Sequence, residues 1–378
     1  MADLNGALKT PLFALHEELG GSLVDFAGYA LPVRYPAGIM AEHIHCRDSA
    51  ALFDVSHMGQ ALLEGPDHET TARALEALTP SAFAKLAPGR MRYSVFLNES
   101  GGIIDDFIVT RPADPALDGT LMLVVNGACK EKDYAFLEQN LPQGITLKRL
   151  DDKALIALQG PKAVDALSRH APKADSLTFM SHTLDQIDGK SVGISRCGYT
   201  GEDGFEISCA ADDAEAIARL LLNEAEVQPA GLGARDSLRL ESGLCLYGHD
   251  LDENTDPAEA DLGWAIQKSR REDKAFPGAD RILKGLAEGP ARIRVGLRIE
   301  GKAPAREGAE IQDMDGKVIG IVTSGGFAPS LQAPIAMGYV PPAFASEGTK
   351  VKLAVRKRAL EAEVAPMPFV PQRYIRKP

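Results

Sequence analysis

The chain has 378 residues, which is long enough for two or three domains with sizeable cores. Hydrophobic residues make up 45% of it and charged residues 25%, the mix of an ordinary globular protein. The net charge of -12 argues against broad binding of nucleic acid or of an anionic membrane, because both partners favour a basic surface.

The five cysteines are scattered along the chain, and no two of them form a C-x-x-C pair. This pattern predicts neither a disulfide framework nor a zinc site, and a reducing compartment fits it best. The histidines are also dispersed, so we expect no metal. The first residues lack the basic and apolar regions of a signal peptide, and no apolar run reaches membrane-spanning length. We therefore expect a cytoplasmic protein.

The first quarter of the chain mixes helical and strand patterns. Apolar spacing, glycine and proline set the expected boundaries. The expected elements are a helix over 10–19, a strand over 22–26, an irregular aromatic and proline segment over 28–36, a helix over 39–52, a strand over 60–64, a helix over 66–78 and a strand over 91–97.

A turn over 98–102 then joins the last of these strands to the run Gly101–Thr110, which predicts a hairpin. This run is apolar except for Asp105 and Asp106. Alternation along a strand places the two acids on opposite faces, so we expect that they cannot serve the same pocket. An ionised carboxylate among apolar neighbours is costly unless it is paired or shifted in pKa. Either one acid is the chemical centre or, as the pattern alone favours, both are paired with arginines.

Strands and helices continue to alternate up to residue 225, and the spacing favours an α+β fold with antiparallel sheets over a doubly wound parallel fold. The expected elements are a strand over 121–126, a helix over 130–141, a strand over 154–158, a helix up to 169, strands over 192–197 and 205–208, and a helix over 212–225. A charged junction with a helix is expected over 268–289. The short strands beyond residue 290 indicate a small β-barrel or sandwich.

Two side chains near glycine-rich turns are candidates for binding. Glu206 follows the loop that holds Tyr199, and the strand pattern alone favours a solvent-facing acid over a pocket residue. Arg235 opens a helix and offers a planar fork to a carboxylate or a heterocycle edge. A salt bridge from Arg235 to Asp105 or Asp106 is an equally good interpretation. The loop lacks the phosphate-loop signature, and no nucleophile elbow supports a hydrolase.

Eight short motifs, in order, resemble one family closely. They are Thr10-Pro-Leu-Phe13, Val24-Asp-Phe-Ala-Gly28, Leu52-Phe-Asp-Val-Ser-His-Met-Gly59, Gly101-Gly-Ile-Ile-Asp-Asp106, Leu158-Gln-Gly-Pro161, Gly198-Tyr-Thr-Gly-Glu-Asp-Gly-Phe-Glu206, Gly231-Leu-Gly-Ala-Arg-Asp236 and Leu246-Tyr-Gly248. The family is the aminomethyltransferase, or T-protein, of the glycine cleavage system. The resemblance runs nearly end to end, through Met367-Pro-Phe-Val370.

The resemblance implies a three-domain cloverleaf of the folate-binding type. Residues 1–280 would form two interwoven α+β subdomains, and residues 290–378 a C-terminal β-barrel. It also implies a reaction in which the methylene of an aminomethyl group, carried by lipoylated H-protein, passes to tetrahydrofolate. The products would be methylenetetrahydrofolate, ammonia and the dihydrolipoyl H-protein.

The resemblance also implies roles for single residues. Asp106 would be the catalytic aspartate, a choice that periodicity cannot make. The folate-binding residues would be Glu206 and Arg235 as polar contacts, Tyr93, Tyr199 and Met58 as stacking and apolar walls, Asn126 as a further polar contact, and Tyr374.

Four alternatives stay open at this stage. Other folate-dependent enzymes of the superfamily demethylate sulfonium or methylamine substrates. A second group follows a flavin domain, whose dinucleotide fingerprint this sequence lacks. A third serves iron–sulfur assembly and carries a K-G-C-Y-x-G-Q-E motif, where this chain has Arg196-Cys-Gly-Tyr-Thr-Gly-Glu-Asp203. The fourth is a non-catalytic folate-binding protein.

Overall fold

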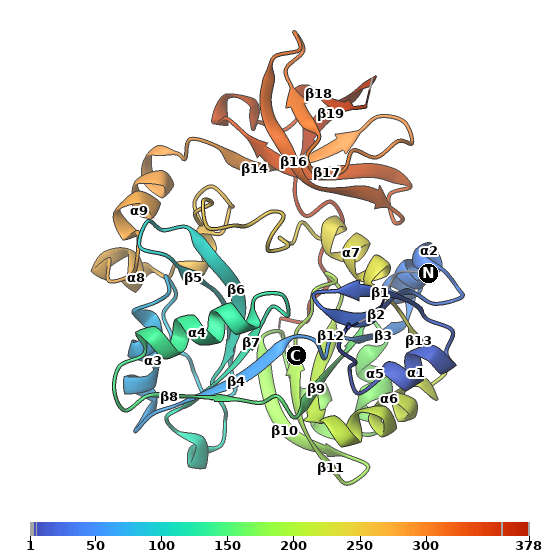
Figure 1. Ribbon diagram of the computed structural model, residues 1–378, viewed down its shortest axis with the longest axis vertical. Coiled ribbons are helices and arrows are strands. Elements are labelled where there is room, and N and C mark those ends of the chain that lie inside the picture. Colours follow the sequence, from blue (N-terminus) through green and yellow to red (C-terminus); the bar gives the residue numbers. More distant parts are fainter. Residues whose placement is uncertain (1–3, 5, 357, 377–378) are drawn as a thin grey trace.

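The computed structural model describes residues 4, 6–356 and 358–376. Three lobes are arranged as a cloverleaf, with a C-terminal barrel above two lobes that are each built on a sheet (Figure 1). The predicted α+β class, the antiparallel sheets and the C-terminal barrel are thereby confirmed. Within the described residues, no helix is both long and apolar enough to cross a membrane.

The first lobe is built on a five-stranded antiparallel sheet. Its strand order is β5 (Met91–Leu97), β6 (Ile103–Thr110), β7 (Thr120–Val125), β4 (Gly59–Glu64) and β8 (Thr146–Arg149). Helices α3 (His68–Glu76) and α4 (Lys130–Asn140) contact this sheet. Asp67 caps α3, since its side chain accepts a hydrogen bond from the backbone amide of Thr70. Tyr134 and Leu137 of α4 join the lobe's buried apolar core.

The second lobe is built on a six-stranded sheet, in which only the pair of β13 and β3 is parallel. Its strand order is β10 (Ser181–Ile187), β11 (Lys190–Arg196), β12 (Gly204–Ala210), β9 (Lys153–Gln159), β3 (Ala50–Asp54) and β13 (Val227–Pro229). Strand β3 precedes the whole first lobe in sequence, and the other five strands follow it. The chain therefore leaves this lobe, builds the first lobe, and returns.

Several smaller elements belong to the second lobe. They are α1 (Phe13–Glu18), β1 (Ser22–Phe26), β2 (Tyr29–Arg34), α2 (Ile39–Asp48), α5 (Ala163–Ser168), α6 (Ala214–Leu222) and α7 (Leu232–Glu241). Two further helices, α8 (Lys268–Asp273) and α9 (Ala279–Glu288), lie beside β5 of the first lobe and lead to the barrel (Figure 1). Short 3-10 helices are found at Pro115–Leu117, Pro172–Ser176, Ala211–Asp213, Gly263–Ala265 and Pro342–Phe344.

Two expected elements of this region are wrong. The segment 28–36 is not irregular, because β2 pairs with β1 in a two-stranded hairpin that accommodates Pro32 at its edge. The helix expected over 39–52 ends at Asp48, and the alanines that extended the pattern belong to β3. All five residues of β3 are buried between β9 and β13, so pairing decides their conformation.

The C-terminal lobe is a closed six-stranded barrel. Its strand order is β14 (Ile293–Ile299), β17 (Ala333–Val340), β16 (Val318–Ala328), β15 (Glu310–Gln312), β18 (Lys350–Val355) and β19 (Arg358–Ala365), and β19 pairs back with β14. Val, Ile, Leu and Ala side chains fill its interior. Closure leaves no free sheet edge.

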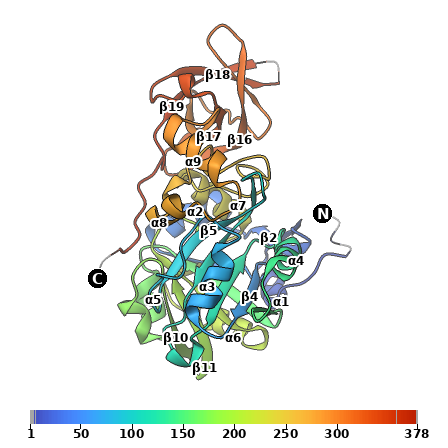
Figure 2. The same cartoon turned by 90° about the vertical axis from the view of Figure 1, so that its left-hand side faces the viewer.

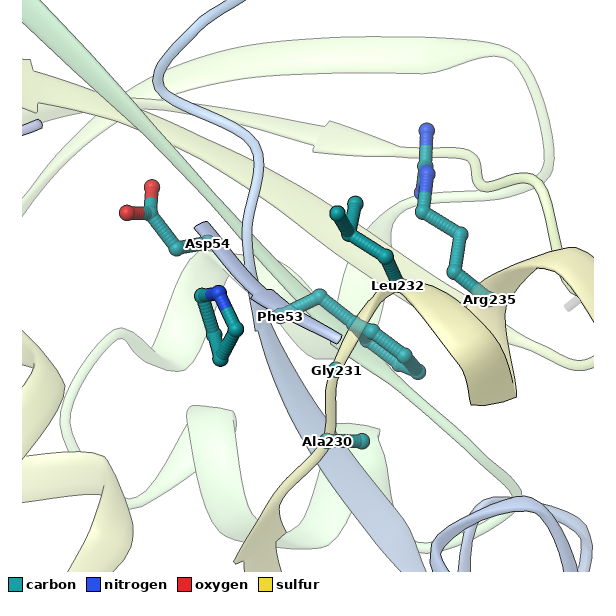
Figure 3. Close-up of a pocket in the computed structure, with 7 residues that line it drawn as sticks. Phe53, Asp54, Ala230, Gly231, Leu232 and Arg235 are labelled. Carbon is teal, nitrogen blue, oxygen red and sulfur yellow. The ribbon is translucent and has the colours of Figure 1, made fainter. Parts of the chain in front are cut away.

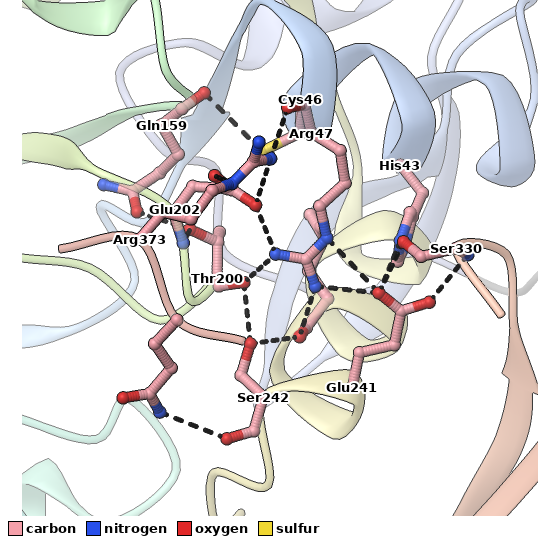
Figure 4. Close-up of polar contacts among 12 residues, drawn as sticks. His43, Cys46, Arg47, Gln159, Thr200, Glu202, Glu241, Ser242, Ser330 and Arg373 are labelled. Carbon is pink, nitrogen blue, oxygen red and sulfur yellow. Dashed lines mark hydrogen bonds and ion pairs between the residues drawn. The ribbon is translucent and has the colours of Figure 1, made fainter. Parts of the chain in front are cut away.

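A buried polar network ties the lobes together (Figure 4). The guanidinium of Arg47, on α2, donates to Glu202 in the 198–204 loop at 2.7 Å and to Glu241 on α7 at 2.8 Å. Ser330, beside the barrel, donates to Glu241 at 2.7 Å. The tail after β19 runs from the barrel back along the other lobes (Figure 2), where Arg373 pairs with Glu202 at 2.6 Å.

Candidate active site

The β5–β6 hairpin positions the acids of interest. Strand β5 pairs regularly with β6 from the pair Met91–Thr110 to the pair Phe96–Asp105. Leu97 then pairs with Ile103, so Ile104 is an extra residue that forms a bulge in β6. Bulges bend a strand and redirect its side chains. At Gly102, a Cβ atom would lie 1.8 Å from the carbonyl oxygen of Glu253, so only glycine fits there.

Asp105 and Asp106 share one partner. The side-chain amide of Asn126 donates to Asp105 Oδ1 at 3.0 Å and to Asp106 Oδ1 at 2.9 Å, and its backbone amide faces Asp105 Oδ2 at 3.3 Å. The two acids thus share a hydrogen-bond donor, but only Asp106 is partly exposed, and the expectation that they do not serve the same pocket stays a prediction. Strand β7 ends at Val125, opposite Phe107, and the next residue, Asn126, donates to both carboxylates.

The sequence pattern alone favoured ion pairs between arginines and both acids, and that interpretation is wrong. Among the described residues, neither Asp105 nor Asp106 forms an ion pair within 4.0 Å. Asp105 is 0% exposed, whereas Asp106 is half-buried. The enclosed position of Asp106 and the charge of Asp105 raise its pKa to about 7, against hydrogen bonds from Asn126 and Tyr93 that lower it. Asp106 can therefore exchange a proton near neutral pH.

Aromatic side chains surround Asp106. Tyr93 lies on β5 beside the Asp106 carboxylate. Burial and the charge of Asp106 raise the pKa of the Tyr93 phenol. The ring of Trp264 lies 5.3 Å from that of Tyr93, and its side chain is 64% exposed. The hydroxyl of Tyr199 donates to the carbonyl oxygen of Cys245. Trp264 was not predicted as a site residue. The one signal in the sequence is that it is the chain's single tryptophan.

Arg235 and Glu206 form the charged side of the site. The guanidinium of Arg235 lies over the ring of Tyr199 at 4.9 Å, and its Nη1 atom is buried with no hydrogen-bond partner among the described residues. Burial lowers the pKa of Arg235. The nearby carboxylate of Glu206 raises it, but by less. Glu206 is half-buried and accepts from the thiol of Cys197 at 3.4 Å. Arg235 is thus not bridged to Asp105 or Asp106, and Glu206 is not a fully solvent-facing acid.

Met58 and Tyr374 complete the predicted set. Met58 packs against a buried cluster that includes Ala234, the neighbour of Arg235. Tyr374 stacks on Phe179 with ring centroids 4.0 Å apart. All eight predicted site side chains are half-buried, as expected of groups that line a space reached by solvent. They are Met58, Tyr93, Asp106, Asn126, Tyr199, Glu206, Arg235 and Tyr374.

A small pocket lies behind this group, between β2, β3 and the start of α7 (Figure 3). Asp54 and Arg235 both line it, but their charged ends point away from one another. The pocket has room for about one water molecule. It is therefore too small for a substrate larger than water. No cluster of three or more potential metal ligands occurs in the described part of the chain.

The arrangement thus combines a carboxyl group that titrates near neutrality, a carboxylate and a guanidinium with unused hydrogen-bonding capacity, and several aromatic faces. Such a set suits a flat, polar heterocycle that takes part in proton transfer. It defines the class of a group-transfer enzyme for a heterocyclic cosubstrate.

Comparisons with known proteins give the same answer for the whole chain. Residues 12–270 match the GCVT N-terminal domain, and residues 292–371 match the glycine cleavage T-protein C-terminal barrel domain. The mitochondrial aminomethyltransferase of Flaveria anomala is 44% identical, over 97% of this chain and 90% of that protein. The corresponding protein of Dictyostelium discoideum is 42% identical, over 98% and 94%.

A solved structure agrees. The glycine cleavage system aminomethyltransferase T from Bartonella henselae is 43% identical and superposes with a TM-score of 0.91, covering 97% of this chain and 99% of that one. The chain therefore belongs to the glycine cleavage T-protein family. This confirms the resemblance found in the sequence and the class of enzyme, an aminomethyltransferase that uses folate.

Proposed function

We propose that this site transfers the methylene of an aminomethyl group, carried on the lipoyl arm of H-protein, to tetrahydrofolate, with Asp106 as the catalytic residue. One observation carries the proposal. Asp106 is half-buried, hydrogen-bonded to Asn126 and beside Tyr93, and its pKa is raised to about 7. A carboxylate of this kind is suited to a reaction that moves protons between nitrogen atoms.

The polar residues present fit tetrahydrofolate. The pterin ring offers a flat edge of N–H donors, which the carboxylate of Glu206 would accept. Arg235 has a buried Nη1 atom with no partner among the described residues, and a ligand acceptor would satisfy it. Tyr93, Tyr199 and Met58 would supply stacking and apolar walls.

The reaction balances with Asp106 as a proton carrier. Two bonds form between folate nitrogens and the methylene carbon, and the bonds of that carbon to sulfur and to the leaving nitrogen break. Two protons leave the folate nitrogens, and ammonia and the lipoyl thiol take up one each. Asp106 would accept a proton from an attacking nitrogen and return it to a leaving group. Its negative charge would also stabilise positive charge on the carbon during transfer.

The test is an assay of the purified protein with aminomethyl-loaded, lipoylated H-protein and tetrahydrofolate. Ammonia and methylenetetrahydrofolate should form together, and only when folate is present. Folate-independent ammonia release, or none, would refute the proposed reaction.

A substitution tests the assignment to Asp106. Asp106→Asn should lower kcat by about a hundredfold, because a positioned acid–base group is lost, and should leave the folate Kd within about threefold. Asp114→Asn, at an exposed acid of the same lobe, is the matched control and should leave both constants unchanged. Full activity in Asp106→Asn would remove Asp106 from the catalytic role.

We also propose a cytoplasmic location for this protein. The relatives from Flaveria anomala and Dictyostelium discoideum are named as mitochondrial enzymes.

A further inference from the structure

The face of α4 that packs below the two site aspartates buries an acid to which the proposed reaction gives no role. Asp133 is 0% exposed, and neither oxygen of its carboxyl group receives a hydrogen bond from any described residue. It lies four residues after Cys129 and four before Leu137, both buried, so all three share one helix face. An ionised carboxylate in such a place, without a donor, is strongly disfavoured.

The titratable and charged groups that face Asp133 come from two elements. They are Asp105 and Asp106 on β6, and Cys129, Lys132 and Tyr134 at or on α4. Lys132 is the only cation among them, and it is engaged elsewhere. Its ammonium donates to the carbonyl oxygen of Ile104 at 2.7 Å and, at the surface, to Tyr247 at 3.1 Å and Glu253 at 3.4 Å.

Donors are divided unequally between the two buried acids. Asp105 receives both the backbone and side-chain amides of Asn126, and its charge also acts on the thiol of Cys129. Asp133 receives no donor from the described residues, and Asp105 is the neighbouring group whose charge acts on it most strongly. When two carboxyl groups share one proton, the charge stays where the donors are. The charge therefore belongs to Asp105 and the proton to Asp133.

The electrostatics agree with this geometry. Burial raises the pKa of Asp133 to about 10, and the charge of Asp105 adds to that effect. With the proton on Asp133, its O–H group can donate a further hydrogen bond to Asp105, and Asp133 is no longer a buried charge without a donor. The pair then carries one negative charge rather than two.

We propose that Asp133 is a positioning residue, which stays a neutral carboxylic acid at neutral pH and donates a hydrogen bond to Asp105. Asp105 is then fixed, and it holds the Asn126 amide in place to donate to Asp106. This inference rests on the proposed function of Asp106, because it explains how that residue is held. It also explains why a buried acid without a partner is present on α4.

The first experiment reads the protonation state directly in the free, full-length protein. Aspartate carboxyl carbons are labelled with ¹³C, and the spectrum is followed from about pH 6 to about pH 8, the range in which an ordinary aspartate is fully ionised. We expect one signal of a neutral carboxyl group that persists over the whole range and is missing from Asp133→Asn. If no neutral signal that depends on Asp133 is seen at the upper end, the proposal is overturned. No substrate is needed, so this result stands even if the proposed reaction is wrong.

The second experiment separates positioning from bulk structure. Asp133→Asn retains an N–H donor for Asp105, whereas Asp133→Leu has a similar size but no donor. Loss of a supporting hydrogen bond costs on the order of tenfold or more in rate, so we expect kcat to fall by at least about tenfold in Asp133→Leu and by less than about threefold in Asp133→Asn. The folate KM should stay within about threefold in both variants.

Equal losses of kcat in the two variants, or no loss in either, would contradict the proposed hydrogen bond. Thermal unfolding of both variants shows whether Asp133→Leu folds. If it does not, the spectrum of the free protein and the kcat of Asp133→Asn still decide the question.

Discussion

Asp106 combines partial exposure with a raised pKa, and this combination makes the pH dependence of the reaction testable. The carboxylate form is the active one in both of its proposed roles, so kcat/KM, which reports ionisations of the free enzyme, should rise as pH increases through about 7. The charge of Asp105 raises the pKa of Asp106, so removing that charge in Asp105→Asn should move the rise to lower pH. The measurement is kcat/KM for ammonia release at a series of pH values. A rise centred near pH 4 in the unmodified enzyme would contradict the raised pKa.

The same raised pKa predicts an effect on stability. In the unfolded chain Asp106 ionises near pH 3.8, whereas in the folded protein it holds its proton up to about pH 7. The folded state therefore binds more protons between these values, and its stability falls as pH rises through that window. Asp106→Asn removes this cost, which is on the order of a few kcal/mol.

The thermal midpoint of Asp106→Asn should thus exceed that of the unmodified protein by about 5 °C at pH 8, and the difference should vanish near pH 4. Calorimetry at the two pH values measures it. A variant that is less stable at pH 8 would show that Asp106 is not held at a cost in the folded protein.

Glu206 and Arg235 should affect binding rather than chemistry. Glu206→Gln replaces a carboxylate that accepts N–H groups by an amide that is half donor, so the folate Kd should rise by about tenfold or more while kcat at saturation changes little. Glu215→Gln, at a partly exposed acid on α6, is the control. Fluorescence titration with folate gives the Kd. Unchanged affinity in Glu206→Gln would remove Glu206 from the folate site.

At the residue scale, the sequence pattern alone could not decide between Asp105 and Asp106 as the catalytic residue. Alternation indicated a strand with one acid on each face, and the strand is there. It could not predict that Asn126 would contact both acids, because this depends on where β7 ends and on the bulge at Ile104. The sequence pattern predicted α4 as a helix but did not indicate which of its faces is buried, so it did not single out Asp133.

At the scale of elements, Arg47 holds α2, α7 and the 198–204 loop together, and its removal should be costly. Arg47→Met would leave two fully buried carboxylates, Glu202 and Glu241, without this partner. Both keep other donors, so we expect a loss of about 3 kcal/mol and a fall of the thermal midpoint by about 5 °C. Arg169→Met is the matched control, since Arg169 also pairs with two acids but is 46% exposed.

The control should cost less than about 1 kcal/mol, because water screens an exposed pair. Thermal or denaturant unfolding of the two variants gives the comparison. Equal losses would mean that burial of the Arg47 network adds nothing to stability.

Element predictions succeeded where the pattern is local and failed where pairing decides. Strand β6 with its turn, helix α4 and the barrel strands other than β19 follow from their own sequences. Strand β3 lies in an alanine run that favours helix, and becomes a strand because β9 and β13 flank it. Strand β19 closes the barrel but has charged residues on its outer face, and it was not predicted.

At the scale of the molecule, the proposed site draws on parts of the chain that lie far apart in sequence. Asp106 and Asn126 come from the first lobe, Glu206 and Arg235 from the second, and Tyr374 from the tail beyond the barrel. Local patterns could not bring these together. The family resemblance did so, because it carries residues over by motif and needs no knowledge of the path of the chain.

The tail that follows the barrel carries Tyr374, a residue of the proposed folate site, and Arg373 anchors this tail. Arg373 pairs with Glu202 at 2.6 Å, and its backbone amide donates to the carbonyl oxygen of Gly201 at 2.7 Å. Two residues further on, Ile375 accepts from the amide of Phe179 at 2.6 Å, which seats Tyr374 on the Phe179 ring. Arg373→Met removes the charged anchor and keeps the side-chain length.

We therefore expect faster hydrogen exchange at the amide of Phe179 and across the 198–204 loop in Arg373→Met, because local opening becomes easier when an anchoring pair is lost. The folate Kd should rise as Tyr374 loses its position, and exchange in the barrel strands should not change, since the barrel is closed through β14 and β19. Arg358→Met, at an exposed arginine of β19, is the control for loss of charge. If exchange at Phe179 is the same in both variants, Arg373 does not hold the tail, and Tyr374 must be positioned by its stacking on Phe179 alone.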